Sequence, residues 1–347
     1  MNRVLINIKG VVQGVGFRPF VYNLARSLGL KGNVTNTADG VTVDIEGEDI
    51  DAFIVRLPKE APPLSEIKNI SVSKMPFHGY EDFEILKSGN RGGFTLLSPD
   101  ISICEDCLKE LLDKTDRRYL YPFINCTNCG PRYTITNAIP YDRQNTTMSV
   151  FKMCPECKKE YDDPADRRFH AQPNACPICG PEVKLVVSGQ LSVVSKSPIE
   201  TAIQLLKEGK IIAVKGIGGF HIACDAANRD AVERLRALKR KSNKPFALMA
   251  PDMETIEKYC EVSEEEKKLL NSNKKPVVLL RKKVDCSLPD SVAPNNKYLG
   301  FMLPYTPLHY LLFYYSLSGL TADSYQLLAN FDALVMTSGN LSEEPIS

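Results

Sequence analysis

Eight of the eleven cysteines fall into four Cys-x-x-Cys pairs, and this array constrains the fold more than any other feature of the sequence. Its second half repeats the first at an offset of 50 residues, and the repeat extends to Asp116–Tyr119 and Asp166–Phe169. Because each pair places two thiolates on one tight turn, and two such turns form a tetrahedral sulfur cage, the array predicts two closed structural zinc sites. The predicted ligands are Cys104, Cys107, Cys126, Cys129, Cys154, Cys157, Cys176 and Cys179.

Other uses of these cysteines fit the sequence less well. Disulfides or redox pairs are the alternative, but four pairs in tandem repeat are unlike the single motif of redox proteins. Consecutive and interleaved pairing both agree with the spacing, and His170 is a further candidate ligand although four sulfurs already fill the shell. The remaining cysteines, Cys224, Cys260 and Cys286, are scattered. This usage predicts a reducing, cytoplasmic compartment.

Length and charge set broader limits. A chain of 347 residues suggests two or three domains. The formal net charge of +1 provides no global attraction to nucleic acid or membrane. No apolar run approaches the roughly 20 residues of a membrane helix, and the first nine residues alternate like a strand rather than a signal peptide. We expect an α+β multidomain protein with domains at 1–90, 91–185 and 186–347, called below the first, middle and third segments.

The first segment has the pattern of a small α+β domain. The predicted elements are a strand at Val4–Ile8, a helix at Phe17–Leu28, strands at Gly32–Thr37 and Val41–Glu46, a helix at Glu48–Leu57 and strands at Ile70–Ser73 and Phe83–Leu86. This β-α-β-β-α-β order is typical of a ferredoxin-like fold.

A glycine-rich loop at the start of the first helix carries the chemistry of this segment. Its glycines let backbone amides turn inward around an anion at a helix start, and Arg18 supplies a bidentate positive charge. The pattern predicts a phosphate cradle, with a plain tight turn as the alternative. The candidate phosphate-binding residues are Gln13, Gly14, Val15, Gly16 and Phe17.

Two stretches of this segment resemble the acylphosphatase family, namely Gly10–Arg18 (GVVQGVGFR) and Gly32–Gly40 (GNVTNTADG). The resemblance implies that Arg18 holds the phosphoryl group and that Asn36 orients the attacking water. No general base is obvious, which suits a substrate with a good leaving group, because placement and charge stabilisation then suffice.

The middle segment has two interpretations besides the zinc sites themselves. The arginine pairs at 117–118 and 167–168 would serve a nucleic-acid-binding finger. No recognition helix rich in lysine and arginine is visible, so we expect a structural spacer.

The third segment alternates helices and strands, as an α/β domain does. Helices are predicted at Ile199–Leu206 and Ala231–Leu238, and strands at Ile211–Val214, Phe246–Ala250, Val277–Arg281 and Ala333–Met336. A flexible turn, Lys215–His221, follows the first strand, and a basic run, Lys239–Pro245, follows the second helix. The basic run is either a phosphate site or a solvated helix end whose charge suits the helix dipole.

These loops resemble the YrdC/Sua5 family, which makes acyl-adenylates from ATP. Ser338 and Asn340 match that family's S-x-N pair, and Lys239 matches the first residue of its K-x-R pair. Position 241 is lysine, which keeps the charge but loses the bidentate fork of arginine. The resemblance implies ATP, with Mg²⁺, as co-substrate. The candidate nucleotide-binding residues are Lys215, Lys239, Lys241, Lys244, Thr337, Ser338 and Asn340.

The three segments in this order resemble the HypF family of carbamoyltransferases, which act in nickel–iron hydrogenase maturation. The resemblance implies hydrolysis of carbamoyl phosphate to carbamate, formation of carbamoyl adenylate from carbamate and ATP, and transfer of the carbamoyl group to the C-terminal cysteine of HypE. That group is the precursor of the cyanide ligands on iron. The chain ends at Ser347, so we expect an N-terminal fragment without the transfer domain and with a truncated third segment.

Two other function classes stay open. One is a stand-alone acylphosphatase with an inert zinc module, against which the ATP-type loops argue. The other is a zinc-finger module that binds nucleic acid, which salt-dependent binding to RNA or DNA would favour.

Overall fold

The computed structural model describes residues 2–37, 39–62, 64–86, 97–187, 190–191, 197–239, 243–315 and 329–339. The chain divides into two compact units, Met1–Cys107 with Ile124–Pro181 and Leu108–Phe123 with Glu182–Ser347. Residues 87–96, at the predicted boundary between the first and middle segments, lie outside the described residues. No helix among the described residues is long and apolar enough to cross a membrane.

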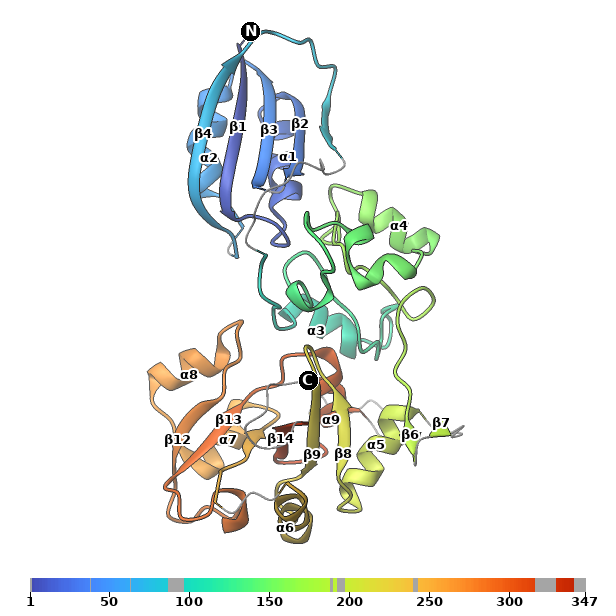
Figure 1. Cartoon of the computed structure of the whole chain (residues 1–347), viewed down its shortest axis with the longest axis vertical. Coiled ribbons are helices and arrows are strands. Elements are labelled where there is room, and N and C mark those ends of the chain that lie inside the picture. The colour runs from blue at the N-terminus through green and yellow to red at the C-terminus, as the bar shows by residue number, and fades with distance from the viewer. Residues whose placement is uncertain are drawn as a thin grey trace. The chain divides into compact units, whose positions relative to one another are not determined.

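The first unit contains a five-stranded sheet covered by two helices. Its elements are β1 (Asn2–Val11), α1 (Phe17–Ser27), β2 (Lys31–Thr37), β3 (Gly40–Gly47), α2 (Ile50–Lys59), β4 (Glu66–Met75) and β5 (Phe83–Ile85). The strand order is β4-β1-β3-β2-β5, with antiparallel pairs except for the parallel β2–β5 pair (Figure 1). The predicted ferredoxin-like arrangement is confirmed, and β5 is a further strand after the β-α-β-β-α-β order.

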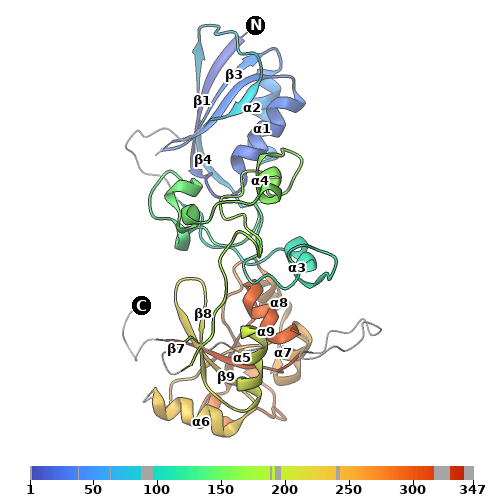
Figure 2. The same cartoon turned by 90° about the vertical axis from the view of Figure 1, so that its right-hand side faces the viewer.

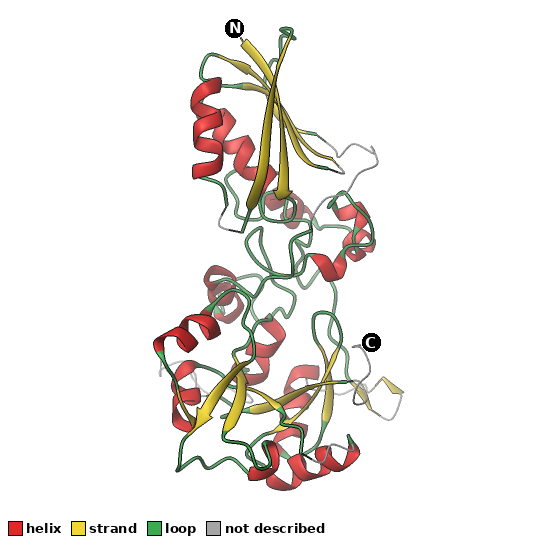
Figure 3. Cartoon of the chain, turned by 60° about the vertical axis from the view of Figure 1, so that its left-hand side comes forward, coloured by secondary structure: helices red, strands yellow, loops and turns green. Residues whose placement is uncertain are grey.

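Both helices lie on one face of this sheet (Figures 2 and 3). The reason is the alternation within the strands, which turns every second side chain toward that face. In β1 the buried hydrophobic side chains are Val4, Ile6 and Ile8, and they pack in one core with Val21 of α1 and Phe53 of α2. This packing fixes the loop between β1 and α1, which is where the cradle residues lie.

The rest of the first unit consists mainly of loops and short helices around the cysteines. The helices are α3 (Glu105–Leu112), whose first turn carries Cys107 and whose residues from Leu108 onward belong to the second unit, α4 (Pro155–Asp162), and the 3₁₀ helices η1 (Tyr133–Ile135), η2 (Arg143–Asn145) and η3 (Thr147–Val150). With so little regular structure, this segment depends on its sulfur clusters and on side chain–backbone hydrogen bonds for its shape.

The second unit is an α/β fold built on a seven-stranded sheet. Its elements are α5 (Pro198–Lys207), β8 (Ile212–Lys215), β9 (Phe220–Asp225), α6 (Arg229–Leu238), β10 (Ala247–Met249), α7 (Met253–Tyr259), β11 (Cys260–Glu261), α8 (Glu264–Asn271), β12 (Val278–Lys282), η4 (Asp290–Val292), β13 (Tyr298–Met302), α9 (Pro307–Tyr314) and β14 (Leu334–Ser338). A two-stranded ribbon, β6 (Val186–Val187) with β7 (Gln190–Leu191), precedes them.

The sheet order is β11-β12-β13-β10-β14-β9-β8, so β14 lies between β10 and β9 although it comes last in sequence among the described strands. All six predicted helices and strands of this segment are present to within a few residues, and the α/β class is confirmed. The predicted turn Lys215–His221 is too long: it closes at Gly216–Gly219, and His221 lies inside β9. The hairpin is tight because Gly218 adopts a φ of 83°, which favours glycine.

Candidate functional site

The sequence-predicted phosphate cradle closes around one small cavity. Gly14 and Gly16 both have a φ of 75°, which lets the loop curl inward at the start of α1. Arg18, in the first turn of α1, and Asn36, on β2, are buried and line the same cavity as these glycines. Two predicted catalytic residues from separate elements are therefore brought together with the loop.

The other predicted cradle residues take different places. Gln13 is buried, and its side chain is engaged within the protein: Nε2 donates to the carbonyls of Thr37 (2.7 Å) and Gly40 (2.8 Å). Its side chain therefore braces the loop against the β2–β3 turn, and Gln13 also lines the cavity. The Val15 side chain lies in the hydrophobic core, and Phe17 lines the cavity.

A second wall of the cavity comes from the middle segment and was missed by the sequence analysis. We call it the finger wall; its residues at the cavity or bonded to Arg18 are Thr127, Arg132, Tyr141, Asp142, His170, Ala171 and Gln172. Arg18 Nη2 lies 2.8 Å from Asp142 Oδ1 and donates to the Tyr141 carbonyl at 3.3 Å. Asn36 Nδ2 donates to the same carbonyl at 3.3 Å.

Arg132 ties the finger wall to the cradle loop. It is buried; its Nε donates to the Gly14 carbonyl, and its Nη2 donates to the carbonyls of Cys126 (3.1 Å) and Thr127 (2.8 Å). One guanidinium thus spans from the first cysteine cluster to the glycine whose conformation shapes the cradle. A five-donor planar group suits such a bridge between carbonyls.

Two buried ring side chains at the cavity have shifted pKa values. Burial, with the Arg18 cation as a smaller cause, lowers the pKa of His170 to about 4, so its imidazole is neutral at neutral pH. Burial also raises the pKa of Tyr141. Arg18 and Arg132 therefore supply the positive charge of the site, while His170 contributes a neutral polar edge.

No local pattern identifies the finger wall, because its residues lie more than 90 positions beyond the cradle loop in sequence. One indirect signal exists. The stretch between Pro131 and Met153 has no counterpart after Pro181 in the 50-residue repeat, and Tyr141 and Asp142 lie within it. A segment that departs from an internal repeat is a reasonable place to look for added function.

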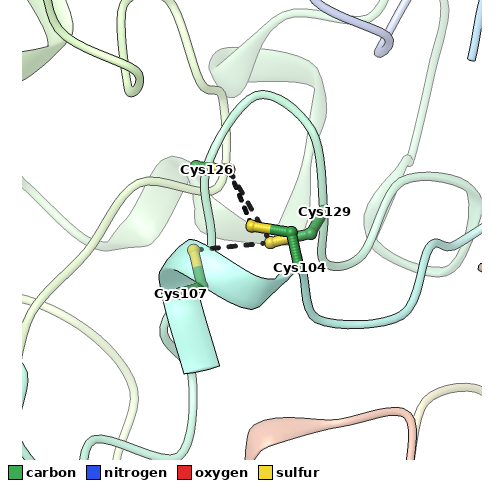
Figure 4. Close-up of side chains that lie close together, drawn as sticks. All are labelled: Cys104, Cys107, Cys126 and Cys129. Atoms are coloured by element: carbon green, nitrogen blue, oxygen red, sulfur yellow. Dashed lines mark hydrogen bonds between the residues drawn. The ribbon is translucent and has the colours of Figure 1, made fainter. Parts of the chain in front are cut away.

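The eight paired cysteines form two separate sulfur clusters, each from consecutive pairs. Neighbouring sulfurs lie 3.7 Å (Cys104–Cys126), 3.8 Å (Cys126–Cys129) and 3.5 Å (Cys129–Cys107) apart in the first cluster (Figure 4). The second cluster repeats this with 3.7, 3.7 and 3.6 Å. Interleaved pairing does not occur, and His170 lies outside both clusters.

The sulfur spacing fits a tetrahedral metal and excludes disulfides. Four sulfurs held about 2.3 Å from a central metal are about 3.8 Å apart, whereas a disulfide bond is about 2.05 Å long. All eight cysteines are free thiols in the structure. Arg167 Nη1 donates to Cys107 Sγ at 3.1 Å, and this contact would offset part of the charge of four thiolates around a metal ion.

In the third segment the structure joins two of the predicted motifs. Lys239, at the C-terminal end of α6, is buried, and its Nζ donates to the carbonyl of Ser338 at the end of β14. Lys215 lies with its Nζ 4.7 Å from the Phe220 ring, and the exposed Lys244 accepts at its carbonyl from Arg236. Thr337 is buried on β14. Lys241 and Asn340 lie outside the described residues.

An aromatic and imidazole cluster adjoins this pair. His221 lies opposite Ser338 in the β9–β14 register, and its Nε2 is 3.1 Å from Tyr305 Oη. His309 packs against both rings and is fully buried, which lowers its pKa to about 3. Among the described residues neither ring nitrogen of His309 has a hydrogen-bond partner. His221 was predicted only as the end of a turn, and Tyr305 and His309 were not predicted from the sequence.

The fold and sites define a class of protein: a ferredoxin-like domain with a glycine-rich loop and a buried arginine at one cavity, joined to two four-cysteine fingers and an α/β domain. Comparison with known families identifies each part. The family models that match are Acylphosphatase at residues 4–85, HypF finger at 103–136 and 153–186, and the Sua5/YciO/YrdC model described as Telomere recombination at 204–347.

Whole-chain relatives agree with these matches. Carbamoyltransferase HypF2 of Cupriavidus necator is 48% identical over 353 residues, covering 99% of this chain and 43% of that protein. A crystal structure of full-length HypF in the phosphate- and nucleotide-bound form matches with a TM-score of 0.89 and 49% identity, covering 99% of this chain and 44% of that one. The chain belongs to the HypF family, and it spans less than half the length of these relatives.

The first segment also has free-standing relatives. The acylphosphatase of Thermotoga petrophila is 42% identical over 88 residues, which cover 24% of this chain and 97% of that protein. The cradle of Gln13–Arg18 therefore belongs to a module that exists without a finger wall.

Proposed function

We propose that this chain carries out the early steps of carbamoyl transfer, beginning with hydrolysis of carbamoyl phosphate in the first segment. The observation that carries the proposal is the convergence of Arg18 and Asn36, from α1 and β2, on one cavity closed by the cradle loop. Water oxygen attacks phosphorus, the bond from phosphorus to the carbamoyl oxygen breaks, and carbamate leaves with that electron pair as inorganic phosphate forms.

Each residue has a role that its position supports. Arg18 and the backbone amides of the loop hold the phosphoryl oxygens and stabilise the charge that develops on them. Asn36, whose Oδ1 is buried and lacks a partner among the described residues, orients the water. Carbamate is a good leaving group, so placement and charge stabilisation supply the rate without a strong general base.

We propose that both sulfur clusters hold structural zinc. Four thiolates close the tetrahedral shell and leave no open position for substrate, which is the pattern of structural rather than catalytic zinc. Zinc bound in this way contributes folding free energy to a segment that is mostly loops. Free thiols that bind zinc also agree with a reducing, cytoplasmic location.

The third segment is proposed to join carbamate to ATP, with Mg²⁺ on the phosphates, giving carbamoyl adenylate and pyrophosphate. The buried Lys239 beside Ser338 supports this, because a cation and small donors at the end of a strand suit a triphosphate. We assign Lys215, Lys241, Lys244, Thr337 and Asn340 to the same site. The carbamoyl group then goes to the C-terminal cysteine of HypE, towards the cyanide ligands of nickel–iron hydrogenase.

A turnover experiment tests these steps in order. Carbamoyl phosphate and ATP are supplied separately and together, and phosphate, pyrophosphate and ADP are measured. We expect phosphate from carbamoyl phosphate alone, and pyrophosphate only when both substrates are present, with no ADP. ATP binding by calorimetry adds a readout independent of turnover; absence of both ATP binding and pyrophosphate would contradict the adenylation step.

The structure gives the nucleic-acid alternative little support. Arg118 and Arg168, the second members of the two arginine pairs, are 1% and 4% exposed, and Arg167 contacts Cys107 Sγ. Phosphate contacts require exposed cations. A stand-alone acylphosphatase remains a separate outcome of the turnover experiment, namely phosphate release without any pyrophosphate.

A further inference from the structure

The second finger places at the cavity an imidazole whose ring nitrogens bind nothing within the described part of the chain. His170 lines the cavity and is partly exposed. Its hydrogen bonds to the described residues run through the backbone: its N donates to the Tyr161 carbonyl at 3.0 Å, and its carbonyl accepts from Gln172 Nε2 at 2.7 Å. A polar ring held at a cavity without such a partner is available to a ligand.

Aromatic packing holds this ring in place. The centroid of the imidazole lies 4.9 Å from that of Tyr161 and 4.7 Å from that of Phe169, which meets it edge-on. Phe169 in turn packs edge-on against Tyr22 of α1, with 5.4 Å between the ring centroids. Because α1 also carries Arg18 in its first turn, the imidazole and the guanidinium are positioned by one set of packed elements. A group that is fixed before a ligand arrives loses little conformational freedom on binding it.

The backbone does not require an imidazole at this position. His170 has a φ of 53°, and the matching residue of the first repeat, Leu120, has a φ of 56°. The Leu120 N donates to the Leu111 carbonyl at 2.8 Å, just as the His170 N donates to the Tyr161 carbonyl. Since leucine forms the same turn with the same hydrogen bond, the ring of His170 is not needed for the local structure and is a candidate for function.

The residues that line the cavity divide into a buried floor and a partly exposed rim. Arg18 and Asn36 are 7% and 1% exposed, whereas Thr127 and His170 are at the rim. The cavity measures about 30 Å³, room for roughly two water molecules, so a phosphoryl group bound at Arg18 takes up this space and the rest of the substrate lies at the rim. The Thr127 hydroxyl already donates to the Arg167 carbonyl at 2.9 Å, which leaves the His170 ring as an uncommitted donor there.

The geometry of the reaction directs the leaving group toward the same rim. In phosphoryl transfer the attacking and leaving oxygens lie roughly in line with phosphorus. With the attacking water at the buried Asn36, as proposed above, the leaving oxygen points away from the floor. A neutral imidazole has one N–H donor, and burial keeps the His170 ring neutral at neutral pH by lowering its pKa to about 4.

We propose that His170 is a catalytic residue, and that its ring N–H donates a hydrogen bond to the oxygen of the departing carbamate. This inference rests on the proposed function of the first segment. As the bond from phosphorus to that oxygen breaks, the electron pair stays on the oxygen, and a donor fixed beside it stabilises the growing negative charge. No proton is transferred, because carbamate leaves as an anion and the imidazole keeps its hydrogen.

The test compares kcat/KM for carbamoyl phosphate and acetyl phosphate in the wild-type chain and in His170→Leu, His170→Asn and His170→Gln. Leucine removes the donor and suits the backbone of this turn, as Leu120 shows. We expect His170→Leu to lose about 10- to 100-fold on both substrates, because both leave as carboxylates and each loses a hydrogen bond to a charged group. The amide N–H groups of Asn and Gln lie near the places of Nδ1 and Nε2, so one of these variants should recover part of the loss. His78→Leu, which removes an exposed imidazole outside the cavity, is the matched control.

Inhibition by inorganic phosphate separates this role from a general disturbance of the cradle. Phosphate binds at Arg18 and has no leaving group, so its inhibition constant should stay within about three-fold of wild type in each His170 variant. Full activity in His170→Leu, recovery in neither amide variant, or a parallel loss of phosphate inhibition would overturn the role of His170. A wild-type chain that releases phosphate from acetyl phosphate but not from carbamoyl phosphate would instead overturn the proposed function.

Discussion

The two halves of the cysteine repeat have the same local backbone conformation, but they contribute different side chains to the cavity at the cradle. In each half an aspartate accepts from the backbone N two residues later, at 2.6 Å for Asp116 and 2.7 Å for Asp166. Leu120 and His170, again 50 positions apart, share the left-handed conformation with φ of 56° and 53°. That conformation is uncommon for side chains with a Cβ, so its repetition shows that the local backbone was duplicated together with the cysteines.

The side chains at matching positions have different tasks. His170 and Gln172 line the cavity over the cradle, while the first half has Leu120 and Pro122 at these places. Gln172 also accepts from Arg143 and so holds the finger wall. The repeat supplies a scaffold, and its departures from symmetry supply side chains to the site.

The largest effect is expected from the metal ligands. Cys107→Ser and Cys157→Ser should each remove one of two proposed zinc ions per chain, and each should destabilise the first unit by several kcal/mol, because zinc binding is folding free energy. Elemental analysis with thermal unfolding measures both effects. Cys286→Ser, outside the clusters, should keep two zinc ions.

The two cysteine variants should also affect the site by different routes. The first cluster is joined to the cradle through Arg132, which donates to the Cys126 carbonyl and to the Gly14 carbonyl. Cys107→Ser should therefore disturb hydrolysis through the cradle loop, and Cys157→Ser through the finger wall. A chain with one zinc ion or none, or with disulfides among these cysteines, would show that the clusters are not zinc sites.

The next largest effect is expected from removal of the Arg18 guanidinium, the proposed phosphoryl-binding cation. Arg18→Ala should lower kcat/KM for carbamoyl phosphate by about 100-fold or more, since a preorganised charged donor contributes a few kcal/mol to the transition state. Asn36→Ala should lower turnover with less effect on inhibition by phosphate. Arg26→Ala, on the exposed side of the same helix, is the control. If turnover is unchanged in Arg18→Ala, the loop is only a tight turn and does not bind the phosphoryl group.

How far the sequence predicts this site depends on the range of the contacts. The sulfur clusters, the cradle glycines, Arg18 and Asn36 follow from short motifs, because the neighbours that fix them are close in sequence. Tyr141 and Asp142 meet Arg18 across more than 120 positions, and only the tertiary packing of the fingers selects them. His309 is similar: nothing within a few residues of it predicts an imidazole buried beside His221.

Arg167 offers a smaller test of the asymmetry between the repeats. Its Nη1 donates to Cys107 Sγ, so an arginine of the second half supports the cluster of the first. Arg167→Ala should weaken retention of one zinc ion by about 10- to 100-fold in competition with a chelator, as loss of a ligand's hydrogen-bond partner does. Arg117→Ala, the exposed counterpart in the first half, should have a smaller effect. Equal effects would argue that both arginines act only through general charge.

The smallest effect concerns His170, replaced by the leucine that the first repeat has. The folded pKa of about 4 lies below the unfolded value of 6.5, so between these values the unfolded chain binds a proton that the folded chain does not. Stability is therefore fully present above about pH 6.5 and is lost as the pH falls toward 4. From pH 7 to pH 5 the loss due to this ring amounts to as much as about 2 kcal/mol.

His170→Leu should lose less stability over that interval than wild type does. The buried His309, whose pKa is about 3, changes stability in the same direction but is present in both proteins, so its contribution cancels in the comparison. Urea unfolding at the two pH values gives the four free energies needed. If wild type and variant lose the same amount, the His170 ring is protonated in the folded protein, and the cavity beside Arg18 carries an additional positive charge that the first repeat, with Leu120, cannot provide.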